Sequence, residues 1–67
     1  MYLMARIDTQ TGVETEWFVA FTPDVEQVQV TRTRKNARRF KRESDAMSAR
    51  DMAANIAPEH QWKVVAA

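Results

Sequence analysis

Residues 14–21, ETEWFVAF, carry the clearest strand pattern in the sequence. Apolar and polar side chains alternate along it, which is typical of a strand with one face buried. One face would carry Thr15, Trp17, Val19 and Phe21, and the other would carry Glu14, Glu16, Phe18 and Ala20. Trp17 and Phe18 then point to opposite sides, so a single covering helix buries only one of them. If Trp17 is in the core, Phe18 lies on the open face and marks an interface; burial of Phe18 under a loop or the last strand is the alternative.

The segments on either side of this strand complete an α+β pattern. Residues 2–7 predict a first strand, joined to residues 14–21 by a turn that contains Gly12. Residues 25–33, rich in Val and Thr, predict a third strand. Alanines recur at helical spacing between Ser44, a plausible N-cap, and a helix end before Pro58. Residues 61–65 predict a last strand, so residues 1–67 should form a single β-β-β-α-β domain: an antiparallel β-sheet of three to four strands with one helix packed on one face.

A chain of 67 residues has a small core and often needs additional stabilisation. It has no cysteine and one histidine, so disulfides, thiolate metal sites and His-rich metal clusters are excluded. A homodimer is therefore one expected source of stability. The apolar stretches are too short to span a bilayer, and the first residues lack the pattern of a secretion signal, which predicts a cytoplasmic protein without a membrane partner.

The charges are strongly segregated along the chain, although the net charge is only +1. Residues 32–42 contain seven bases and no acid: Arg32, Arg34, Lys35, Arg38, Arg39, Lys41 and Arg42. Three interpretations stay open: a solvated face that balances the acidic strands of the same chain, a nucleic-acid footprint, and an electrostatic contact with a protein partner. Phe40 is expected to fold back onto the core. We expect partner contacts from Arg32, Arg34, Lys35, Arg38, Arg39 and Arg42, together with Phe18.

The sequence offers little that could carry catalysis. His60 follows Glu59, but no nucleophile accompanies the pair, so a solvated loop histidine is the simpler interpretation. Glu14 and Glu16 would share a strand face, where bases or water would match them. No phosphate-binding loop, dinucleotide fingerprint or His-Glu metal motif is present. The prediction is a binding protein without a cofactor or a metal, and not an enzyme.

Residues 36–46, NARRFKRESDA, carry an Ala-x-x-Phe element followed by a polar spacer and a helix-opening alanine. With the Trp17 hairpin before it and the strand at residues 61–65 after the helix, this plan resembles small bacteriophage-encoded proteins, among them anti-CRISPR proteins. The resemblance implies a host-takeover protein that occupies a surface of a host protein or ribonucleoprotein complex by steric occlusion. DNA mimics are strongly acidic, which this chain is not. The alternative is a small nucleic-acid-binding accessory protein that uses the arginines of residues 32–42.

Overall fold

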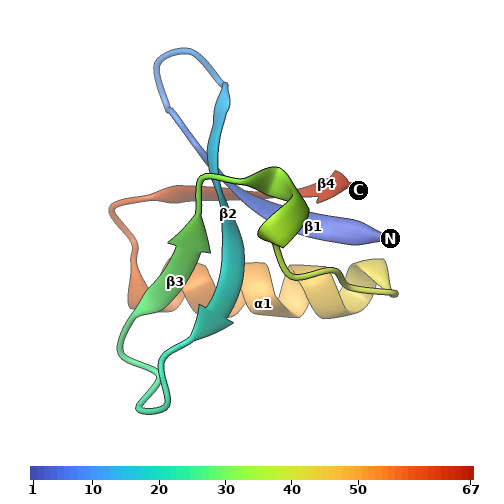
Figure 1. Ribbon diagram of the computed structural model, residues 1–67. Helices are drawn as coiled ribbons and strands as arrows, with labels where there is room; N and C mark the ends of the chain where they lie inside the picture. The colour runs from blue at the N-terminus through green and yellow to red at the C-terminus, as the bar shows by residue number, and fades with distance from the viewer.

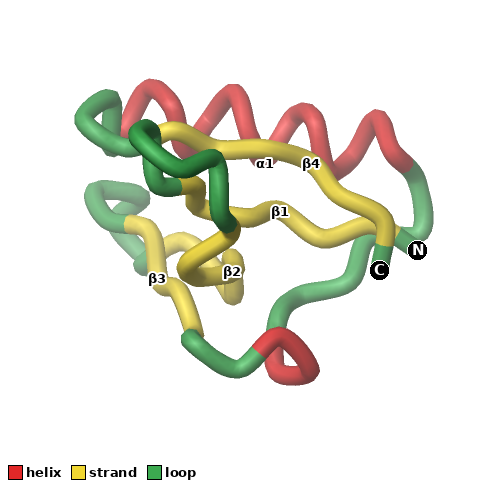
Figure 2. The backbone as a smooth tube through the Cα atoms, turned by 90° about the horizontal axis from the view of Figure 1, so that it is seen from above, coloured by secondary structure: helices red, strands yellow, loops and turns green.

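The computed structural model describes residues 1–67 and arranges four strands, one α-helix and a short 3₁₀ helix in two layers (Figure 1). The elements are β1 (Tyr2–Ile7), β2 (Glu14–Phe21), β3 (Val28–Thr31), η1 (Arg34–Asn36), α1 (Glu43–Ile56) and β4 (Gln61–Ala66). The strands pair antiparallel in the order β3-β2-β1-β4. Figure 2 shows α1 on one side of the sheet and η1 on the other. The predicted α+β architecture with one helix on a four-stranded sheet is confirmed.

The core lies between α1 and the helix-facing side of the sheet. Met4, Phe18, Trp62 and Ala53 form its buried cluster. Ala46 and Ala53 are completely buried on α1, and their short side chains let the helix lie close to β1 and β4. Only eight residues of the chain are buried, so each large core side chain carries a substantial share of the stability.

The faces of β2 differ from the expected alternation because the strand contains a bulge at Val19. Phe18 pairs with Val30, whereas Ala20 already pairs with Gln29. The additional residue interrupts the period of two and turns Phe21 to the same side as Phe18, where the two ring centroids are 4.8 Å apart. Phe18 is 2% exposed, and Trp17 is half-buried on the opposite face. The prediction that Phe18 lies exposed on the open face was therefore wrong.

A second irregularity separates Glu14 from Glu16. β1 pairs Arg6 with Glu16 and Ile7 with Glu14, so Thr15 is the extra residue. Glu16 forms an ion pair with Arg6, while Glu14 accepts a hydrogen bond from Trp17 Nε1–H at 3.0 Å. The two carboxylates consequently lie on opposite faces of the sheet, and the expectation that they share one face was wrong.

Two predicted boundaries also differ. The third strand covers only Val28–Thr31, because the residues before it form the turn from β2. The helix begins at Glu43, with Arg42 at the N-cap position and no side-chain cap, so Ser44 lies inside the first turn and is not the cap. Glu43 and Asp45 in this first turn interact favourably with the positive end of the helix dipole.

The turn between β2 and β3 holds Val25 in the left-handed region, with φ of 57°. Its side chain is 43% exposed, so little packing compensates for the strain of a β-branched residue in this conformation. Left-handed backbone costs an ordinary residue about 1–2 kcal/mol, whereas asparagine adopts it more readily. Val25→Asn should therefore raise the free energy of unfolding by about 1 kcal/mol in urea denaturation. Val13→Asn, at an exposed position without positive φ, is the control and should change it by less than about 0.5 kcal/mol.

Candidate functional site: the basic connection

The segment from residue 32 to residue 42, here called the basic connection, joins β3 to α1. Its backbone is bonded to the sheet at two places. The Arg38 N–H donates to the Phe18 carbonyl at 2.9 Å, and Phe40 and Tyr2 exchange two hydrogen bonds of 2.8 Å each. The backbone pairing of β1 with β2 ends at Ala5 and Trp17, so residues 38–40 take the place of a strand partner for Tyr2. The basic connection is thus an anchored part of the fold.

The Phe40 side chain strengthens this anchor. Its ring packs against the core cluster and stacks on Phe18, with centroids 6.0 Å apart and planes inclined by 22°. This confirms that Phe40 folds back onto the core. The Arg38 guanidinium carbon lies 5.6 Å from the centroid of the same ring, within the range of a cation–π contact. An isolated aromatic residue among bases predicted the position of the Phe40 ring, but nothing in the sequence indicated the backbone pairing with Tyr2.

Arg34 differs from the other bases because its guanidinium bonds within the protein. One nitrogen lies 3.5 Å from Glu14 Oε1, and the other donates to the Ala66 carbonyl at 2.6 Å. Glu14 also accepts from Trp17, so Arg34 links β2, β4 and η1 on the sheet face opposite α1. This side chain has a structural role in addition to its place in the basic connection.

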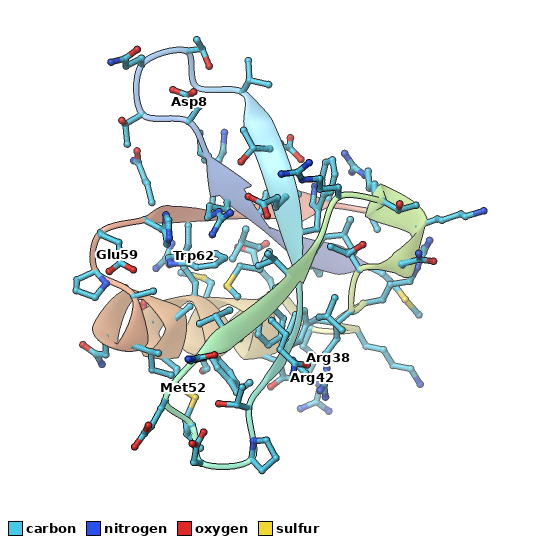
Figure 3. The ribbon with its side chains drawn as sticks, turned by 60° about the vertical axis from the view of Figure 1, so that its left-hand side comes forward. Asp8, Arg38, Arg42, Met52, Glu59 and Trp62 are labelled. Atoms are coloured by element: carbon cyan, nitrogen blue, oxygen red, sulfur yellow. The ribbon has the colours of Figure 1, made fainter.

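The remaining six bases of the basic connection are exposed, and none of them forms an ion pair: Arg32, Lys35, Arg38, Arg39, Lys41 and Arg42. Figure 3 shows Arg38 and Arg42 on the same side of the molecule. Among the bases of the basic connection, only Arg34 is neutralised by an acid of the strands, namely Glu14. Glu16 pairs with Arg6, which lies outside the basic connection. Five of the six bases expected to contact a partner are therefore exposed and unpaired on one anchored segment, with Lys41 as a sixth, while Phe18 is buried.

The residues considered for chemistry lie elsewhere. His60 Nε2 is 3.3 Å from Arg6 Nη1 and 3.6 Å from Glu59 Oε1, beside a hollow of about 230 Å³ that Trp62 also lines. No nucleophilic hydroxyl or thiol lines this hollow, and no three His, Asp or Glu side chains gather as a metal-binding group.

Asp24 is the one residue whose pKa is clearly shifted from its usual value. The Thr22 hydroxyl donates to it at 2.6 Å and the Glu26 N–H at 3.2 Å, and these bonds hold the pKa of Asp24 below its usual value. Both partners belong to the turn between β2 and β3. The shift therefore reflects local turn structure and not a reaction centre.

Two further findings bear on the class of the protein. The α-helix is too short and too polar to cross a membrane. The sequence matches no protein-family model, no curated protein and no solved structure.

Proposed function

We propose that this chain is a small binding protein that acts in the host cytoplasm by occupying a surface of a host protein complex and inhibiting or redirecting it. One observation carries the proposal: six exposed, unpaired bases lie on a segment whose backbone is bonded to the sheet. A pre-ordered segment loses less conformational entropy on binding than a mobile loop does. Guanidinium groups held in this way suit carboxylates on a partner.

The resemblance to small phage proteins, including anti-CRISPR proteins, supplies the class of partner in this proposal. Steric occlusion suits a domain of this size, because the basic connection can contact an acidic patch while the rest of the domain covers the neighbouring surface. The excess of unpaired positive charge would speed the encounter with such a patch and make it dependent on salt.

Neutralising the centre of the basic connection should abolish capture of the partner. The double variant Arg38→Gln, Arg39→Gln removes two positive charges from exposed side chains, so we expect it to retain the thermal stability of the wild type within a few degrees. Tagged wild-type protein, incubated with nuclease-treated bacterial lysate at low salt, should retain a protein complex. The variant should retain less than about a tenth of it, equivalent to a loss of at least about 1.4 kcal/mol of binding free energy.

The matched control is Thr9→Glu, Gln10→Glu in the exposed turn between β1 and β2, which lowers the net charge by the same two units. This control should capture the complex as the wild type does. Equal loss in both variants would show that net charge and not the basic connection governs binding, and unaffected capture by the arginine variant would contradict the proposal.

Nucleic-acid binding is the second candidate, and the same six unpaired bases favour it because phosphates bind such groups. No aromatic ring in the chain is fully exposed beside them, so stacking on bases has no platform here. A gel shift with generic duplex and single-stranded DNA separates the two candidates. A shift that weakens steeply with salt and disappears in the arginine variant would favour nucleic acid over a protein partner.

A further inference from the structure

The outer edge of β4 is the longest stretch of unpaired backbone in the sheet. β4 is an edge strand of six residues that pairs only with β1. The Ala67 N–H donates to the Met1 carbonyl, so odd-numbered residues of β4 face β1. Because successive residues of an antiparallel strand alternate, the N–H and C=O groups of Trp62, Val64 and Ala66 point away from the sheet. Arg34 already binds the Ala66 carbonyl, which leaves the other groups without a protein partner.

This edge forms the floor of a shallow hollow of about 490 Å³. β4 contributes Lys63 to Ala66, and Tyr2 and α1 complete the lining with Glu43, Met47 and Arg50. The three helix residues are spaced by four and three positions, so they form one stripe on α1. Met47 is 38% exposed, and Arg50 forms one ion pair, with its neighbour Asp51 at 3.3 Å, and none with Glu43.

We infer that a second copy of this chain occupies the hollow and that two β4 strands pair antiparallel into one eight-stranded sheet. This inference goes beyond the proposed function and does not rest on it. The two-fold axis passes between the Val64 residues, which then exchange two backbone hydrogen bonds. In this register, the Ala66 N–H of each copy donates to the Trp62 carbonyl of the other. Lys63 lies opposite Val65 of the second copy, so the two lysines do not face each other.

The position of α1 is compatible with the same two-fold axis. α1 lies over β1 and β4, so pairing two β4 strands places the helices about two strand spacings apart, roughly 9–10 Å. Packed helices are separated by about 8–10 Å. The helices run antiparallel across the axis, so Met47 meets Met47 of the second copy. Glu43 then approaches Arg50 of the second copy, and each hollow receives the side chains that line the other.

The charges identify a second copy as the occupant and not an acidic or basic partner. The stripe on α1 carries one acid and one base on either side of an exposed methionine, so it is complementary to itself after a two-fold rotation. The basic connection has no such balance and would repel its own copy. A core of eight buried residues also leaves room for stabilisation by association.

Sedimentation over a range of protein concentrations tests the inference. The wild type should convert from monomer to dimer as concentration rises, and Met47→Glu should raise the dimer Kd by at least about tenfold, because two carboxylates would meet at the axis. Met52→Glu is the matched control, an exposed methionine on the same helix that does not line the hollow, and it should leave the Kd unchanged. A monomer at every concentration, or a dimer indifferent to Met47→Glu, would overturn the inference.

Exchanging the charges of Glu43 and Arg50 tests the dimer even if Met47→Glu fails to fold. Glu43→Arg alone should weaken the dimer, because two arginines would then face each other across the axis. Adding Arg50→Glu to the same chain should restore the Kd to within about threefold of the wild type. Additive weakening by the two changes would contradict the proposed pairing.

Amide hydrogen exchange gives a readout specific to the strand pairing. The Val64 N–H should exchange rapidly in dilute protein and slowly in the dimer, while the Val65 N–H, which faces β1, should be protected in both. A dimer in which the Val64 amide still exchanges rapidly would use another surface and would refute the pairing of β4 strands.

Discussion

Phe18→Ala should lower the free energy of unfolding by about 3–5 kcal/mol, the usual cost of truncating a buried phenylalanine. The Phe18 ring contacts Phe21 and Phe40, and it belongs to the cluster that joins β1, β2, β4 and α1. Each kcal/mol corresponds to about 4–8 °C in a domain of this size, so Tm should fall by more than about 10 °C. Urea denaturation and thermal circular dichroism measure both quantities.

Trp17→Ala is the informative comparison, because Trp17 is the adjacent residue on the same strand. It is half-buried on the opposite face, where it donates to Glu14. We expect this larger truncation to cost less than Phe18→Ala. The reverse ranking would mean that Trp17 and not Phe18 is the core residue of β2.

Phe40→Ala should cost about 2–3 kcal/mol, less than Phe18→Ala because the Phe40 ring is only half-buried. The change removes the stack on Phe18 and the support for the Arg38 guanidinium. The amides of Tyr2 and Phe40, which bond to each other's carbonyls, should then exchange faster with solvent. Urea denaturation and amide exchange together measure the loss of stability and the loosening of the basic connection.

Phe40→Leu provides the control, since it keeps an apolar side chain of similar size and should cost less than about 1.5 kcal/mol. If anchoring matters for binding, Phe40→Ala should reduce capture of the partner under conditions where it remains folded, whereas Phe40→Leu should retain most of it. A change of less than about 0.5 kcal/mol in Phe40→Ala would show that the ring does not anchor the basic connection.

Alternating hydrophobicity located the strands at Tyr2–Ile7 and Glu14–Phe21 correctly, because burial of one sheet face leaves a period of two in the sequence. It failed to assign the faces of the second strand. Bulges at Thr15 and Val19 each insert one residue, and neither position carries a glycine that would mark it. Such bulges depend on how neighbouring strands pair, which a single strand does not encode.

The candidate site shows a similar division. The run of bases at residues 32–42 was visible because charge is a property of composition. The structural role of Arg34 could not be predicted from the sequence, because its partners Glu14 and Ala66 lie 20 and 32 positions away in the chain. The same applies to the pairing of Phe40 with Tyr2, which requires the space that opens where β2 leaves β1.

The position of β1 in the sheet also affects when this protein can fold during its synthesis. Among the four strands of this sheet, β1 is synthesised before the others, yet one of its two neighbours is β4, which is synthesised after the other three. The two edges of β1 are therefore paired at different times. One edge pairs early, in the local hairpin with β2, and the other pairs only after Gln61–Ala66 has been synthesised. Until then one edge of β1 is unpaired and the core lacks Trp62, and such incompletely covered strand edges and apolar surfaces favour aggregation.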